Sequence, residues 1–158
     1  MPNPHTFSIL PIAMFIQRYL RPEDVVVGPL CGESSIATYR NDLSKGGLEA
    51  SKWLDILIAQ ELKADVVLLD PPYSPRQMSE CYKSIGLKKG MEGTQNAHLY
   101  KEAKERLTQL LKPNGYALTF GWNSGGFGKY LGFETLEILL VAHGGAHNDT
   151  ICVAEQKL

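Results

Sequence analysis

Four consecutive aliphatic residues, Val66 to Leu69, stand between Asp65 and Asp70, and this segment constrains the fold more than any other in the chain. An apolar run without polar alternation is typical of a parallel strand that is buried on both faces. Parallel strands need crossover connections, usually helices, and these helices cover the faces of the sheet. The segment therefore predicts an α/β fold with a buried central strand.

The rest of the chain alternates between helical and strand-like patterns. Helical periodicity predicts helices over residues 9–20, 48–62 and 100–111. Apolar and β-branched runs predict strands over residues 24–28, 36–40, 65–70, 116–120, 134–143 and 150–155. A short helix is expected at 77–84, inside a long excursion over residues 74–99. This order predicts a mostly parallel sheet with helices on both faces and an antiparallel strand, from the end of the chain, at its edge.

Length and composition favour one compact domain over residues 1–158. Hydrophobic residues make up 44% of the chain and charged residues 21%, which argues against disorder. The net charge is −1, so any binding of nucleic acid depends on a local basic patch. The apolar stretches are too short to span a membrane and no signal peptide pattern is present, so we expect a cytoplasmic protein without membrane contacts.

Cysteine and histidine usage favours neither a disulfide framework nor a metal site. Cys31, Cys81 and Cys152 are odd in number and far apart, so we expect reduced thiols and no zinc finger. His143 and His147 have a spacing seen in metal sites, but the glycines between them indicate a hairpin turn rather than one face of a helix. We therefore expect no bound metal.

Polar or glycine-rich segments follow three of the predicted strands. They are residues 28–32, 41–42 and 70–73. In open α/β sheets, ligands bind beyond the carboxyl ends of the strands, at the point where the strand order reverses. We therefore expect these three segments to contribute to one ligand site.

The segment Asp70-Pro71-Pro72-Tyr73 has the chemistry of a site for a planar amine. The two prolines fix φ at successive positions and leave carbonyl groups without competing local N–H donors. Asp70 and the Pro71 carbonyl would accept the two amine hydrogens, while the Tyr73 ring stacks on the heterocycle. The alternative interpretation is a strand that ends in a proline-stiffened turn with a capping aspartate.

Asp70-Pro71-Pro72-Tyr73 is similar to the signature of amino-methyltransferases, in the form commonest among adenine-N6 DNA methyltransferases. The segment Val25 to Gly32 resembles the cofactor loop after the first strand in that family. The likeness covers nearly the whole chain. It is greatest to small phage- or prophage-type adenine methyltransferases, which are similar at Ser74-Pro75-Arg76-Gln77 and Gly121-Trp122-Asn123-Ser124.

The resemblance implies a single-domain Rossmann-like methyltransferase fold that binds S-adenosyl-L-methionine and methylates the N6 amine of adenine in DNA. The residues implied to hold the cofactor are Gly28, Pro29, Leu30, Cys31, Gly32, Asn41 and Asp42. Those implied to be catalytic are Asp70, Pro71, Pro72 and Tyr73. Those that would bind the substrate are Arg76, Trp122 and Asn123.

Within this implied site, the glycine loop would let the backbone approach the methionine part of the cofactor. Asp42 would accept hydrogen bonds from the ribose hydroxyls, as an acidic residue does at this place in dinucleotide-binding sheets. Its alternative role is that of a helix cap or a turn residue. Trp122 follows a strand at the ligand-binding edge, and its alternative role is that of a core residue.

The chain departs from the family pattern at Gly28, where the family's loop usually opens with an acidic residue. This departure leaves open a degenerate methyltransferase fold that serves as a binding subunit. An RNA or protein amino methyltransferase is the other alternative, because other exocyclic amines and amides suit similar acceptor loops.

No target-recognition domain fits between the cofactor loop and Asp70. Target choice would then fall to the 74–99 excursion, to the loop after Gly121 or to a partner protein. Basic side chains in the excursion would either contact phosphates or form a solvated loop: Arg76, Lys83, Lys88 and Lys89.

Overall fold

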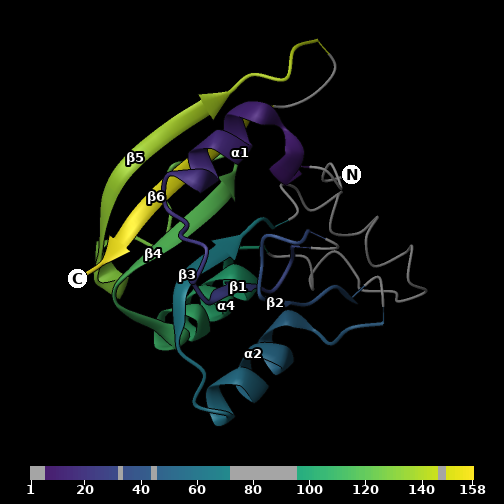
Figure 1. The fold of residues 1–158 in the computed structure, drawn as a ribbon, viewed down its shortest axis with the longest axis vertical. Coiled ribbons are helices and arrows are strands. Elements are labelled where there is room, and N and C mark those ends of the chain that lie inside the picture. The colour runs from purple at the N-terminus through teal and green to yellow at the C-terminus, as the bar shows by residue number, and fades with distance from the viewer. Residues whose placement is uncertain (1–5, 32–33, 44–45, 72–95, 146–148) are drawn as a thin grey trace.

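The fold is built around one six-stranded sheet with the strand order β2-β1-β3-β4-β6-β5. The computed structural model describes residues 6–31, 34–43, 46–71, 96–145 and 149–158 (Figure 1). In this part of the chain no helix is long and apolar enough to cross a membrane.

Four neighbouring strands of the sheet run parallel. They are β1 (Val26–Gly28), β2 (Tyr39–Arg40), β3 (Ala64–Leu69) and β4 (Leu111–Gly121). From β1 the chain first moves to β2 on one side, and later returns to β3 on the other side. The strand order therefore reverses between β1 and β3, which is the place where open α/β sheets bind ligands.

The last two strands are β5 (Phe133–Val141) and β6 (Thr150–Lys157), and β6 is antiparallel to both of its neighbours. The predicted α/β class, the mostly parallel sheet and the antiparallel terminal strand are thereby confirmed. The predicted antiparallel strand at the edge is β5, the first of the two strands that close the chain. Strand β6 is hydrogen-bonded to β4 on one side and to β5 on the other, so β5 takes the edge.

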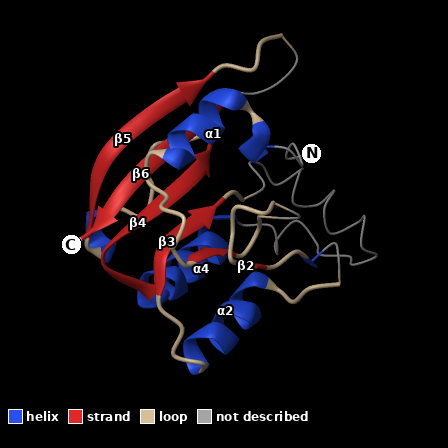
Figure 2. Cartoon of the chain, viewed as in Figure 1, coloured by secondary structure: helices blue, strands red, loops and turns tan. Residues whose placement is uncertain are grey.

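Helices cover both faces of the sheet, as expected from a buried parallel strand (Figure 2). One face packs against η1 (Thr6–Ser8) and α1 (Leu10–Gln17). The other face packs against α2 (Ala50–Ala59) and α4 (Asn96–Leu110). Alternate residues of β3 divide between the two sides.

Two clusters of buried residues follow from this layering. The α1-side core contains Phe7, Ile12, Phe15, Ile16, Val26, Cys31, Ala37, Val66, Leu68, Leu118, Phe120, Val141, Cys152 and Ala154. The α4-side core contains Val27, Leu54, Leu57, Ala64, Val67, Leu69, Ala103, Leu107, Leu110, Leu111, Ala117, Phe127 and Phe133.

The main difference from the predicted elements is the start of β4, which begins at Leu111 rather than at residue 116. Leu111 pairs with Ala64, and the next pair joins Tyr116 to Val66, so the residues between them form a bulge. Asn114 in this bulge has a left-handed backbone with φ of 62°. The helix expected at 77–84 lies outside the described residues.

Asp65 joins the start of β3 to its two neighbours in the sheet. Its Oδ2 accepts the Val25 N–H at 2.8 Å, and its Oδ1 lies 2.7 Å from the Lys112 Nζ. The Lys112 ammonium, and next the Val25 N–H, lower the pKa of the Asp65 carboxyl below its ordinary value. A carboxyl with a lowered folded-state pKa stabilises the fold above its unfolded-state pKa, and this contribution is lost as the pH falls through the folded-state pKa.

We therefore expect Asp65→Asn to lower the free energy of unfolding by about 1–2 kcal/mol at pH 7. The difference from the native chain should begin to shrink below about pH 4, where the carboxyl of the unfolded chain becomes protonated, and should be lost as the pH falls through the lower folded-state pKa. Urea unfolding at pH 7 and pH 3 measures both values. Asp55→Asn is a matched control, because Asp55 is 56% exposed in its ion pair with Arg106 and should contribute less. Equal stability of Asp65→Asn and the native chain at pH 7 would contradict this account.

Candidate active site

Two strand ends meet at the point where the strand order reverses. Gly28 is the last residue of β1, and Asp70 directly follows β3. The two strands are paired through Val26 with Val66 and Val27 with Val67, so their carboxyl ends lie side by side (Figure 1). Residues 41–42 follow β2, which pairs in parallel with β1, so the described parts of all three predicted segments meet at the edge where a ligand is expected.

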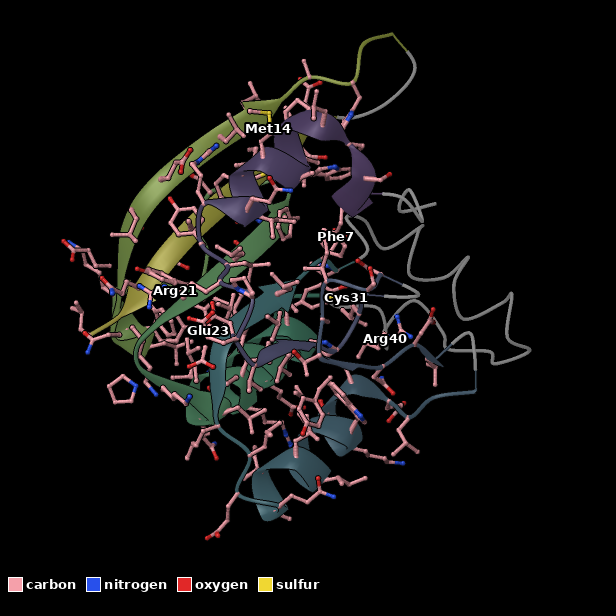
Figure 3. All side chains as sticks on the ribbon, in the orientation of Figure 1. Phe7, Met14, Arg21, Glu23, Cys31 and Arg40 are labelled. Carbon is pink, nitrogen blue, oxygen red and sulfur yellow. The ribbon has the colours of Figure 1, made fainter. Side chains whose placement is uncertain are left out.

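Asp70 is a buried carboxylate at this edge, with 8% of its surface exposed. Burial raises the pKa of the Cys31 thiol, and the charge of Asp70 raises it further. Burial, and then Asp70, likewise raise the pKa of Cys152 to about 12. Both cysteines belong to the α1-side core, together with Phe7. Figure 3 labels Phe7 and Cys31. Because Leu68 belongs to the α1-side core and Leu69 to the α4-side core, strand alternation also places Asp70 on the α1 side of the sheet.

Gly28 is buried, and a side chain at this position would collide with Cys31. A Cβ atom on Gly28 would lie 2.0 Å from the Cys31 Sγ and 3.3 Å from the Ala37 Cβ. The thiol of Cys31 therefore fills the space that a side chain of residue 28 would need.

Asn41 fastens the end of β2 to the loop after β1. Its side-chain amide donates to the Leu48 carbonyl at 2.8 Å and to the Pro29 carbonyl at 3.4 Å, and its Oδ1 accepts the Leu48 N–H at 3.1 Å. Its backbone N–H donates to the Gly28 carbonyl at 3.3 Å. Asn41 therefore positions the loop, and the neighbouring Asp42 is half-buried beside it.

The structure brings together only part of the predicted site. The predicted residues that it places at this edge are Gly28, Pro29, Leu30, Cys31, Asn41, Asp42, Asp70 and Pro71. Four further predicted residues lie outside the described part of the chain: Gly32, Pro72, Tyr73 and Arg76.

Trp122 and Asn123 follow β4 at the same edge of the sheet but apart from Asp70. The Trp122 side chain is 44% exposed, so it is not a core residue. It lines a hollow of about 330 Å³ with Leu140, Asp149 and Ile151. The Asn123 Oδ1 accepts the Gly125 N–H at 3.0 Å and holds the turn that follows.

Glu155 shapes this turn, and sequence analysis did not single it out. It is fully buried in β6, where its Oε2 accepts the Phe127 N–H at 2.5 Å and its Oε1 accepts the Gly128 N–H at 2.9 Å. The Lys104 ammonium donates to the Gly126 carbonyl beside it. Burial lowers the pKa of Lys104, and the nearby Glu155 charge opposes this shift. A lone acidic residue in an apolar strand was the signal that could have found it.

The described part of the last hairpin holds His143 in polar contacts of its own. His143 Nε2 lies 2.7 Å from the Thr150 Oγ1, and its backbone N–H donates to the Asp149 Oδ1 at 3.2 Å. His147 lies outside the described residues. Within the described ranges, no three His, Cys, Asp or Glu side chains gather as a metal ion would require.

The sequence matches no protein-family model and no curated protein, but its fold matches solved structures. TrmN from Thermus thermophilus is 18% identical, with a TM-score of 0.57, over 93% of this chain and 48% of its own. SMU.776, described as a methyltransferase and complexed with SAH, is 10% identical, with a TM-score of 0.54, over 84% of this chain and 45% of its own. The M1.HpyAVI–SAM complex is 17% identical over 70% of this chain and 52% of its own, with a TM-score of 0.47.

The likeness to the first two structures extends over most of the described sheet and its helices. The chain spans about half the length of these structures. At these identities the comparison bears on the fold and not on the reaction. The chain therefore has the α/β fold of these solved structures, one of which is described as a methyltransferase.

Proposed function

We propose that this chain transfers a methyl group from S-adenosyl-L-methionine to the N6 amine of adenine in DNA. The observation that carries the proposal is a buried carboxylate, Asp70, at the end of β3 and beside the glycine that ends β1. This is the place where the fold binds ligands. The resemblance of residues 70–73 to the amino-methyltransferase signature supplies the chemistry.

The residues at this edge fit a nucleoside-containing cofactor. Asp42 follows β2 and is half-buried, and in this proposal its carboxylate accepts hydrogen bonds from ribose hydroxyls. The loop from Gly28 to Cys31 follows β1, and its backbone is held in place by Asn41. These residues would hold the cofactor, which supplies the sulfonium methyl group when it is bound.

Asp70 and Pro71 act on the substrate amine in this proposal. The carboxylate and the Pro71 carbonyl accept the two amine hydrogens, so that the nitrogen lone pair leaves conjugation and becomes nucleophilic. Methyl transfer is direct, without a covalent enzyme intermediate, and the surplus proton on nitrogen then leaves through the Asp70 carboxylate to water. Tyr73 stacks on the base, which must be flipped out of a duplex to reach this site.

Trp122, Asn123 and Arg76 are the proposed contacts to the nucleic acid outside the reacting amine. Trp122 offers an exposed aromatic surface for stacking, and Asn123 holds the turn that follows it. Arg76 would contact phosphate.

A methyltransferase fold that no longer catalyses transfer is the second candidate. The specific observation in its favour is the Cys31 thiol, which fills the space above Gly28 where the family usually carries an acidic side chain. A chain of this kind would bind a partner or a nucleic acid without turnover.

Methyl transfer from radiolabelled cofactor to DNA, RNA and protein, followed by nucleoside and amino-acid analysis, tests the proposal. We expect label in DNA and its recovery as N6-methyldeoxyadenosine. Label found instead in an RNA nucleoside or in an amino-acid side chain would show that RNA or protein, and not DNA, is the substrate. The absence of transfer to all three, with no cofactor binding by calorimetry at millimolar concentration, would support the non-enzyme candidate instead.

A further inference from the structure

The hollow beside Trp122 has the size of a site for one small ligand. Its volume of about 330 Å³ lies near the lower end of small-molecule sites. Its walls are Trp122, which is 44% exposed, Leu140, which is 63% exposed, and Ile151. These walls are aromatic and aliphatic, so they suit a flat ring better than a chain of phosphates.

The hollow lies at the same edge of the sheet as Asp70 but does not reach it. Gly121 at the end of β4 pairs with Ile151, and Ile151 pairs with Leu140. Strand β6 is two strands away from β3, and β4, which Trp122 follows, lies between them.

The hollow and Asp70 also lie on opposite sides of the sheet. Ile151 precedes Cys152, a residue of the α1-side core, so it points to the opposite side. Asp70, in contrast, comes two residues after Leu68 of the α1-side core and directly after Leu69 of the α4-side core, so strand alternation places it on the α1 side. A base in the hollow is therefore a different base from the one whose amine Asp70 would bind.

Asp149 gives the hollow a hydrogen-bond acceptor. Its Oδ1 accepts the backbone N–H of His143 at 3.2 Å, which orients the carboxylate. The carboxylate repels phosphate, but it accepts hydrogen bonds from an exocyclic amine of a base. The chemistry of the hollow thus matches the amino edge and the aromatic face of a nucleobase.

We propose that this hollow binds an unpaired nucleobase with an exocyclic amine, from a nucleotide that flanks the methylated adenine. The proposal rests on the proposed function. Trp122 stacks on the base, and Asp149 accepts a hydrogen bond from its amine, so cytosine is bound better than thymine.

Fluorescence of Trp122 tests the stacking directly, because the chain has only two tryptophans. Trp53→Phe leaves Trp122 as the single indole. This variant, with S-adenosylhomocysteine present, is titrated with single-stranded oligodeoxynucleotides that carry one adenine flanked by cytosines or by thymines. We expect quenching of the emission and tighter binding of the cytosine-flanked oligonucleotide. Trp122→Ala should weaken binding at least about ten-fold, and Trp122→Phe should keep most of it.

Two variants serve as controls for this titration. Tyr130→Ala removes another exposed aromatic side chain, from η4 (Lys129–Leu131), at the opposite edge of the sheet, and should leave binding unchanged. Asp149→Asn keeps an acceptor for the His143 N–H but should remove the preference for cytosine. Binding without quenching, equal effects of Trp122→Ala and Tyr130→Ala, or no oligonucleotide binding at all would overturn the proposal. Quenching without methyl transfer would keep this site and refute the proposed function, so the two are separable.

Discussion

Asp70→Asn will lower the rate of methyl transfer about 10²–10³-fold while leaving the affinity for S-adenosylmethionine within about three-fold. The asparagine side chain has nearly the same shape, but its amide nitrogen cannot accept a hydrogen from the substrate amine and it carries no charge. The loss should therefore fall on the reaction step, because the cofactor is held by the loop after β1 and by Asp42. Single-turnover kinetics and calorimetric titration measure the two quantities separately.

Asp65→Asn is the matched control for this variant, because the two aspartates lie at opposite ends of the same strand. Asp65 lies at the amino end of β3 and is held by Val25 and Lys112. Its replacement should lower stability and leave the transfer rate unchanged. Thermal unfolding of Asp70→Asn shows whether the fold is kept, since Asp70 is buried. If the Asp70→Asn protein is folded and transfers methyl groups at the native rate, Asp70 takes no part in the reaction.

Glu155→Leu is expected to destabilise the fold by about 3–5 kcal/mol. The leucine accepts no hydrogen bond, so the N–H groups of Phe127 and Gly128 lose their partner, and the Phe127 N–H is buried. Removing a charged acceptor from a buried donor costs more than removing a neutral one. Lys104 also loses the nearby negative charge that opposes the effect of its burial. Urea unfolding measures the loss.

Two further variants separate the buried hydrogen bonds from a general effect of strand substitution. Glu155→Gln keeps one acceptor oxygen and should lose about half as much stability as Glu155→Leu. Glu134→Gln, on the exposed side of β5, should change stability by less than about 0.5 kcal/mol. If the free energy of unfolding of Glu155→Leu lies within about 1 kcal/mol of the native value, water has replaced the carboxylate as hydrogen-bond acceptor, and this prediction is wrong.

The position of Asp70 was predictable from sequence because a local signal defines it. The apolar run of β3 shows burial on both faces, and a parallel strand must present its carboxyl end at the edge of the sheet. The structure has this strand at residues 64–69 and places the buried Asp70 directly after it. No information about distant residues was needed.

The features that sequence analysis missed depend on contacts between distant positions. Glu155 meets Phe127 across 28 positions, and local patterns carry no information about such a pair. Which of the two closing strands takes the edge follows from the pairing of β6 with β4, which turn residues alone do not determine. Gly28 and Cys31 are close in sequence, but the fact that the Cys31 thiol occupies the space of a side chain at position 28 is visible only in the coordinates.

The position of bound cofactor relative to Asp70 tests the account most directly. A crystal structure with S-adenosylhomocysteine should place the ligand between the loop after β1 and the end of β3. The open side of its sulfur should face the Asp70 carboxylate and the Pro71 carbonyl across a space for one amine, with about 3 Å between reacting atoms. A ligand bound elsewhere, or an Asp70 carboxylate directed away from the sulfur, would contradict it.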